Sequence, residues 1–178
     1  MPVIVKSSTP IERKDEWRTL PELYKPLAEE FSFQYDFAAS EQNALSHRYF
    51  TEENSALDAA LWWTDRTVPP FGWLNPPFSM FLEFMTKANE QIKLAGELFG
   101  YGAICCLVKA DAPETKWWRN NVVDKHGHTK HEVRYLYPRV PYLDHNGVQV
   151  PYCTFPSALV IMRPRPWRHT TWVKWQSR

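Results

Sequence analysis

The sequence predicts an α/β protein with a mixed, mostly parallel sheet flanked by helices and a hairpin near the C-terminal end. Three observations predict this class. Short apolar segments of strand length alternate with segments of helical periodicity. Ala103 to Val108 is an unbroken apolar run, typical of a strand buried on both faces of a parallel sheet. Asn146-Gly147, within Pro141 to Tyr152, is the strongest short signal for a hairpin turn.

The first half of the chain is expected to hold one clear helix and two strands. Pro21 to Glu30 should be helical, because proline suits the first turn and apolar residues follow at helical spacing. Phe33 to Ala38 alternates aromatic and polar residues, which predicts a strand. Asn54 to Leu61 is expected to form one or two helical turns. Phe71 to Leu74 is a short apolar strand that leads directly into Asn75.

The second half continues the alternation. Ser79 is expected to cap a helix whose apolar residues recur at helical spacing up to about Phe99. Glu114 to Val123 is expected to be helical, and Glu132 to Tyr137 alternates as a strand does. Ala158 to Met162 is expected to be the last buried strand.

Length and composition predict one ordinary globular domain. We expect a polar lead-in over residues 1–16, the domain over 17–164, and a basic, aromatic tail over 165–178. A net charge of +1 excludes a polycation, so any contact with nucleic acid must come from local basic patches. The odd number of cysteines, three, argues against a disulfide framework. Neither a signal peptide nor a membrane-spanning run is present, which favours a cytoplasmic protein.

Two segments fall at the ends of predicted strands, where α/β sheets bind their ligands. The first is Asn75, Pro76, Pro77 and Phe78. An exocyclic amino nitrogen is a poor nucleophile because its lone pair is delocalised into the ring. Two acceptors aimed at its N–H bonds favour the pyramidal, developing cationic form. The asparagine side-chain oxygen and the first proline carbonyl can supply them, the prolines stiffen the loop, and the phenylalanine offers a stacking face.

This tetrapeptide leaves several readings open. The same loop serves methylation of adenine N6, of cytosine N4, of adenine in RNA, and of a glutamine side-chain amide, because all present a planar NH2 group. A rigid strand-to-helix turn with a buried phenylalanine is the structural alternative.

The second segment is a candidate for cofactor binding and consists of Asp36, Phe37, Ala38, Ala39 and Ser40. The acid could bond the ammonium or the hydroxyls of a cofactor, or it could cap the following turn. The small residues that follow allow the backbone to approach a ligand closely.

Basic and aromatic side chains interleave in two stretches, which suits phosphate neutralisation and base stacking, although a solvated face is the alternative. The candidates for DNA contact in the first stretch are Lys116, Trp117, Arg119, Lys125, Lys130, Arg134 and Arg139. Residues 163–178 add five basic residues, no acid, and three tryptophans. His126, His128 and His131 lack a fourth ligand nearby, so no metal site is expected. Residues 119–150 are the best candidate for reading a duplex from which the target base is flipped.

Seven short segments occur in the order typical of one family. They are Trp17-Arg18-Thr19-Leu20-Pro21, Tyr35-Asp36-Phe37-Ala38-Ala39-Ser40, Tyr49-Phe50-Thr51, Asn75-Pro76-Pro77-Phe78-Ser79, Thr115-Lys116-Trp117, Pro138-Arg139 and Phe155-Pro156-Ser157-Ala158-Leu159. In these segments the chain resembles the phage-type DNA adenine-N6 methyltransferases (phage Dam) over roughly residues 16 to 164.

The resemblance implies a Rossmann-like methyltransferase fold, S-adenosylmethionine as cofactor, and adenine in DNA as substrate, in the cytoplasm of a bacterial host. It implies that residues 75–78 are catalytic, that residues 36–40 bind the cofactor, and that Trp17 and Thr19 close over it. Lys109 and Asp111 stand where the family has a different loop, so no role is carried over to them. A DNA-binding protein on the same fold but without activity is the alternative of another class.

Overall fold

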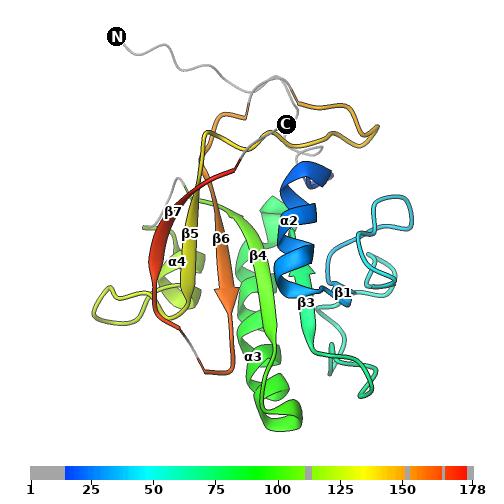
Figure 1. Ribbon diagram of the computed structural model, residues 1–178, viewed down its shortest axis with the longest axis vertical. Coiled ribbons are helices and arrows are strands. Elements are labelled where there is room, and N and C mark those ends of the chain that lie inside the picture. Colours follow the sequence, from blue (N-terminus) through cyan, green and yellow to red (C-terminus); the bar gives the residue numbers. More distant parts are fainter. Residues whose placement is uncertain (1–14, 111–113, 151–152, 166, 176–178) are drawn as a thin grey trace.

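The computed structural model describes residues 15–110, 114–150, 153–165 and 167–175. A seven-stranded sheet in the order β2-β1-β3-β4-β6-β5-β7 forms the centre, with α2 against one face and α3 and α4 against the other (Figure 1). The predicted α/β class is thereby confirmed. Most of the lead-in expected over 1–16, Asp111, and the ends of the expected hairpin and tail lie outside the described residues.

One half of the sheet is parallel. It consists of β1 (Tyr35–Asp36), β2 (Arg48–Tyr49), β3 (Phe71–Leu74) and β4 (Ala103–Lys109). Because these strands run in one direction, their carboxyl ends meet at the same edge of the sheet. The edge therefore carries the residues that follow β1 and β3, which are the two candidate site segments. The strand expected over residues 33–38 is reduced to its two central residues.

The other half is mixed. β6 (Ser157–Met162) runs antiparallel to both β4 and β5 (Glu132–Tyr137), and β7 (Thr170–Lys174) pairs with β5 in parallel. β6 is the last buried strand, as the sequence predicts, but the more exposed β7 follows it within the segment expected to be a tail. Only alternate side chains of β7 are partly buried, so its sequence lacks the apolar signal of an inner strand.

Three helices and one short helical turn complete the described fold. α2 spans Pro21–Phe31, α3 spans Phe81–Phe99 and α4 spans Lys116–Asn121; the turn η1 spans Phe78–Met80. Proline at the start of α2 is the start signal that the sequence predicts, and left-handed Gly100 (φ 78°) ends α3. Within the described chain, no helix has both the length and the apolar character needed to cross a bilayer.

Three local expectations are wrong or hold only in part. Residues 54–61 form turns and no helix, because Ser55 accepts the backbone bonds of a turn before Trp62 enters the core. Ser79 does not cap α3, which begins after Met80 without a side-chain cap. Asn146-Gly147 makes the predicted tight turn, with Gly147 at φ 77°, but the described residues on either side of it form isolated bridges and no strands. The C-terminal hairpin is therefore not found as a pair of strands.

The core has two layers because β4 is buried on both faces, as its apolar run predicts. Cys106 faces α3 while its neighbour Cys105 faces α2, so the two adjacent thiols point to opposite sides and remain free. Gly72 is required in β3, since a Cβ there would lie 2.1 Å from the ring of Phe37. That ring stacks on Trp62 with centroids 4.1 Å apart.

Candidate active site at the carboxyl ends of β1 and β3

Asn75 follows β3 directly and is held by the segment that precedes α2. Its Nδ2 donates a hydrogen bond of 3.0 Å to the Trp17 carbonyl oxygen. Its Oδ1 is buried and has no hydrogen-bond partner within the described residues. Buried polar atoms without partners are rare, and a free acceptor beside a fixed donor is suited to receive an N–H group from a ligand.

The segment from Asp15 to Leu20 crosses the loop and is fixed at three points. Besides the bond to Asn75, the Asp15 carboxylate accepts bonds from the backbone N–H of Ser79, at 2.9 Å, and from its hydroxyl. Arg18 and Leu143 exchange two backbone hydrogen bonds, at 2.8 and 3.0 Å. Ser79 is thus occupied by Asp15, which explains why its side chain does not cap α3. The loop from Asn75 to Ser79 is therefore held by hydrogen bonds at its first and last residues.

Phe78 lies in a cluster of aromatic rings. Its centroid is 5.7 Å from Trp17, 5.9 Å from Tyr142 and 5.2 Å from Phe155, all in edge-on geometry. The Lys109 ammonium, at the end of β4, lies 4.8 Å from the centroid of the Phe155 ring. The ring of Phe78 is half-buried, so the stacking face predicted for it is shared with this cluster.

Asp36 ends β1, next to the strand that carries Asn75. Its side chain is buried, with 3% of the residue exposed. The carboxylate accepts bonds from the backbone N–H groups of Ala38, at 3.4 Å, and Leu45, at 3.1 Å. Burial raises its pKa to about 6, although these two bonds oppose the change. The acid therefore caps the following turn, which was the structural alternative, and is still ionised for the most part at pH 7.

The other predicted cofactor residues divide into two groups. Phe37 is buried in the core against Trp62, so the structure does not support a ligand contact for its ring. Ala38, Ala39 and Ser40 are half-buried and follow the strand end. Trp17 and Thr19 are buried beside the Asn75 loop, and the Nε1 of Trp17 has no partner within the described part of the chain. The two residues in contact, Trp17 and Asn75, therefore each have a buried polar atom without a partner in the described chain: the donor Nε1 of Trp17 and the acceptor Oδ1 of Asn75.

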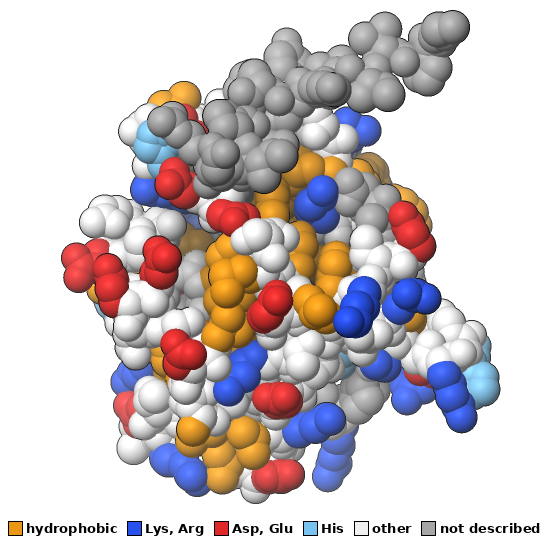
Figure 2. Space-filling model, turned by 180° about the vertical axis from the view of Figure 1, so that it is seen from behind, with side chains coloured by type: hydrophobic (Ala, Val, Ile, Leu, Met, Phe, Trp, Pro, Cys, Tyr) orange, Lys and Arg blue, Asp and Glu red, His pale blue; other side chains and the backbone are white. Residues whose placement is uncertain are grey.

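Four of the predicted DNA-contacting residues are basic and lie on α4 and the loop after it. Lys116, Arg119 and Lys125 are exposed, and Lys130 donates a bond of 2.6 Å to the Asn120 carbonyl. An open hollow of about 620 Å³ lies here, lined by Arg119, Asn120, Val123, Asp124, Lys125, Gly127 and Lys130. Figure 2 shows Lys and Arg side chains gathered on this side of the molecule, and acidic ones over the loops between β1 and β3 on the opposite side.

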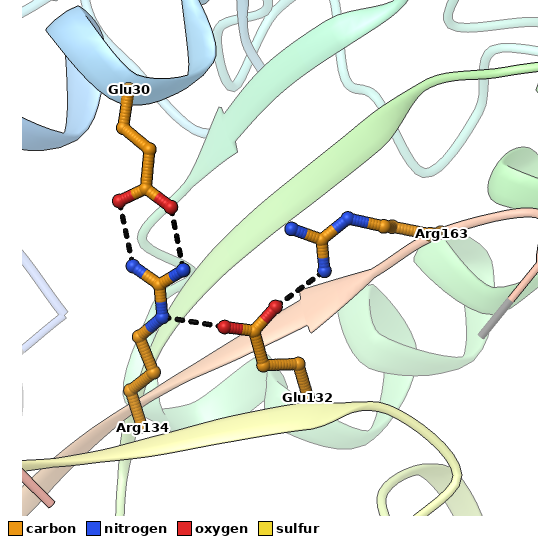
Figure 3. A network of polar contacts seen from close by, with 4 residues as sticks. All are labelled: Glu30, Glu132, Arg134 and Arg163. Atoms are coloured by element: carbon orange, nitrogen blue, oxygen red, sulfur yellow. Dashed lines mark hydrogen bonds and ion pairs between the residues drawn. The ribbon is translucent and has the colours of Figure 1, made fainter. Parts of the chain in front are cut away.

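Arg134, another predicted DNA-contacting residue, takes part in an ion cluster within the fold. Its guanidinium binds both carboxylate oxygens of Glu30 and one of Glu132, whose other oxygen is bound by Arg163 (Figure 3). These four side chains, Glu30, Arg134, Glu132 and Arg163, form the α2–sheet ion cluster. The hydrogen bond to Glu30, more than the one to Glu132, raises the pKa of Arg134 and holds its charge in place. Arg134 is therefore ion-paired within the fold, and its contact with DNA stays a prediction.

The two other residues predicted to contact DNA are Trp117 and Arg139. Trp117 is half-buried against Phe81, and Arg139 is exposed and donates a bond of 3.4 Å to the Cys153 carbonyl. His131 is buried and bonded to Asn89 at 2.9 Å, and burial lowers its pKa to about 4. Within the described residues, no three His, Cys, Asp or Glu side chains are grouped for a metal ion.

Sequence reasoning did not assign roles to three residues around the loop: Asp15, Tyr142 and Phe155. Phe155 belongs to a segment that carries the family resemblance, so its neighbourhood was signalled although its role was not. Asp15 and Tyr142 lie 64 residues from their contacts in the loop, and no local pattern reports such pairs.

The family model for DNA N-6-adenine-methyltransferase (Dam) matches residues 6–176. The chain belongs to this family. It is 26% identical over 166 residues to a DNA N-6-adenine-methyltransferase of Haemophilus phage HP1 (strain HP1c1), which covers 92% of this chain and 87% of that protein. It is 32% identical over 88 residues to one of Escherichia phage T1, which covers 49% of this chain and 35% of that protein. The predicted family and its activity, adenine-specific DNA methylation, are confirmed.

Proposed function

We propose that this DNA adenine-N6 methyltransferase carries out its reaction at Asn75, Pro76, Pro77 and Phe78, with S-adenosylmethionine as the methyl donor. The observation that carries the proposal is the state of the Asn75 amide. Its NH2 group is fixed on the Trp17 carbonyl, while its Oδ1 is buried without a partner in the described chain. The amide is thus oriented before substrate arrives, with its acceptor reserved for a donor from outside.

The chemistry follows from this orientation. Asn75 Oδ1 accepts one N–H of the adenine amino group, and the Pro76 carbonyl accepts the other. Both bonds strengthen as positive charge develops on the nitrogen, so they favour the transition state over the flat ground state. Proton loss follows after the nitrogen has become cationic, so no general base is needed at the start. Phe78, supported by Trp17, Tyr142 and Phe155, packs against the flipped base.

We propose that the cofactor binds between the ends of β1 and β3, against Trp17, Thr19, Asp36, Ala38, Ala39 and Ser40. S-adenosylmethionine supplies an electrophilic methyl group on a positively charged sulfur. The residues fit such a group, because the site offers an unpartnered buried donor on Trp17 and a buried carboxylate on Asp36. The parallel strands with helices on both faces, and a site at their carboxyl ends, favour the Rossmann-like methyltransferase fold.

The experiment that tests this function measures methylated nucleosides. Purified protein, S-adenosylmethionine and methyl-free DNA are incubated, the DNA is digested, and the nucleosides are quantified by mass spectrometry. We expect N6-methyl-2′-deoxyadenosine as the product. N4-methylcytosine would retain the mechanism and change the base. Absence of methylation on double- and single-stranded DNA, while RNA is methylated, would contradict the assignment of DNA as substrate.

Cofactor affinity should depend on pH through Asp36. A carboxylate binds an ammonium or hydroxyl group better when it is ionised, and burial raises the pKa of Asp36 to about 6. We therefore expect the affinity for S-adenosylmethionine to rise on the order of tenfold from pH 5 to pH 7. Calorimetric titration at several pH values measures it, and Asp36→Asn should bind more weakly and lose this dependence.

The stability of the fold should change with pH in the opposite direction to cofactor affinity, which separates an effect on binding from an effect on folding. The pKa of Asp36 is above its ordinary value of 3.8 in the folded protein, so the folded state holds an extra proton between pH 3.8 and about 6. The contribution of Asp36 to stability is therefore lost as pH rises across this window. An affinity that fell along with stability would contradict a direct role for Asp36 in cofactor binding.

DNA affinity should depend on salt through the exposed basic residues near α4. Each phosphate contact contributes about 0.9 to the slope of log affinity against log salt concentration. We expect Arg119→Ala and Lys125→Ala each to reduce that slope by about 1, because both side chains are exposed beside the hollow. Fluorescence anisotropy with a labelled duplex at several salt concentrations measures the slope. Lys25→Ala, on the outer side of α2, is the matched control and should leave it unchanged.

A further inference from the structure

A line of ring-to-ring contacts leads from the proposed catalytic loop to the far edge of the sheet. The rings in order are Phe78, Phe81, Trp117, Trp118, Tyr135 and Trp172, with successive centroids 5.4, 5.0, 5.3, 6.4 and 4.8 Å apart. We call these six residues the aromatic line. Most of its members are buried or half-buried, and they pack on the side of the sheet that α3 and α4 cover.

The line ends on a tryptophan in solvent. Trp172 lies on the edge strand β7 opposite Tyr135 of β5 and stacks on it at an interplanar angle of 26°. In spite of this contact, 70% of Trp172 is exposed, more than any other large hydrophobic residue in the described chain. One face of the indole is thus supported by the fold, and the rest is available to a flat partner.

The charge around this end is positive. Lys174 lies two residues after Trp172 on the same face of β7. It is exposed and forms no ion pair within the described residues. Residues 163–178 contain no Asp or Glu. A supported indole face beside a lysine fits a ligand that combines a flat ring with negative charge, which is the chemistry of a nucleotide.

We propose that Trp172, backed by Tyr135 and with Lys174 two residues along the same face of β7, binds an unpaired nucleotide of the DNA substrate, apart from the target adenine. A paired base has both faces covered by its neighbours in the duplex, so it cannot stack on an indole. An unpaired base can, and such stacking contributes about 1–3 kcal/mol per base in proteins that bind single strands. The inference rests on the proposed function, in which the same strand reaches the Asn75 loop.

Paired variants test the proposal by DNA binding. Labelled oligo-dT, which contains no adenine for the catalytic loop, and a duplex of equal length are titrated with wild type, Trp172→Ala, Trp172→Phe and Trp167→Ala. Trp167 is the control because it is 62% exposed but lies outside the aromatic line. We expect Trp172→Ala to weaken oligo-dT binding by about tenfold, Trp172→Phe to recover part of it, and duplex binding to change less than about twofold.

Other outcomes would overturn the proposal. Equal losses for duplex and oligo-dT would assign Trp172 a general role in folding or phosphate contact. A change of oligomeric state in Trp172→Ala, seen by sedimentation, would make a second copy of the chain the partner. If Trp172→Ala is unstable, Lys174→Ala must weaken oligo-dT more than duplex, or the proposal is wrong. Adenine methylation by the wild type is scored separately, so failure of the proposed function can be distinguished from failure of this one.

Discussion

Asn75→Ala is expected to lower the rate of adenine methylation by about 10²- to 10³-fold while leaving DNA affinity near that of the wild type. The estimate follows the cost of removing one pre-oriented hydrogen-bonding group from a transition state. Asn75 Oδ1 is buried and has no partner among the described residues, so its removal leaves no donor of the protein unsatisfied. The loss should therefore appear in the chemical step, which single-turnover kinetics with saturating DNA and cofactor measures.

Asn75→Asp separates the role of the side-chain oxygen from the role of the side-chain NH2 group. It retains an oxygen for the adenine amino group, but an ionised carboxylate cannot donate to the Trp17 carbonyl and places two acceptors 3.0 Å apart. We expect a rate between those of wild type and Asn75→Ala. Asn54→Ala, at an exposed asparagine in the loop after β2, is the matched control and should retain full activity. Equal rates for Asn75→Ala and wild type would show that the methylation reaction does not depend on the Asn75 side chain.

The sequence predicts those parts of the fold whose burial is uniform along an element. β4 is apolar at every inner position because both of its faces are covered, and α3 repeats its apolar residues because one side packs on the sheet. The Asn75 loop is likewise predicted, since its motif is contiguous. All three signals are local, so a single sequence contains them.

The parts that the sequence does not predict depend on partners distant in the chain. β7 forms because it pairs with β5, although its own residues alternate between half-exposed and exposed. Asp15 fixes the Asn75 loop through Ser79, 64 residues away. Arg134 was expected to contact DNA because its neighbours are basic, whereas its partner Glu30 lies 104 residues away on α2. The sequence shows where a charged residue lies in the chain, but not whether the fold pairs it with a residue of opposite charge.

The pairing of Arg134 leads to the largest expected effect on stability. Glu132 lies between Arg134 and Arg163 with its side chain 5% exposed, while the two arginines are 17% and 25% exposed. Both arginines also lie over the ring of Phe31 at the end of α2, with guanidinium carbons 5.6 and 5.7 Å from its centroid. The α2–sheet ion cluster contains two positive and two negative groups, so its charges balance only while Glu132 is ionised.

Glu132→Gln keeps the shape of the side chain but leaves two partly buried guanidinium groups to share one carboxylate. Removing one partner of a buried ion pair costs about 3–5 kcal/mol, and we expect a loss of about 3 kcal/mol in the free energy of unfolding, measured by urea denaturation. Glu30→Gln is the matched control, because it removes a carboxylate from the same arginine where the side chain is 43% exposed. An exposed pair contributes less than about 1 kcal/mol. Equal losses in the two variants would show that burial does not set the strength of this cluster, and that the exposed Glu30–Arg134 pair stabilises the fold as much as the buried Glu132 does.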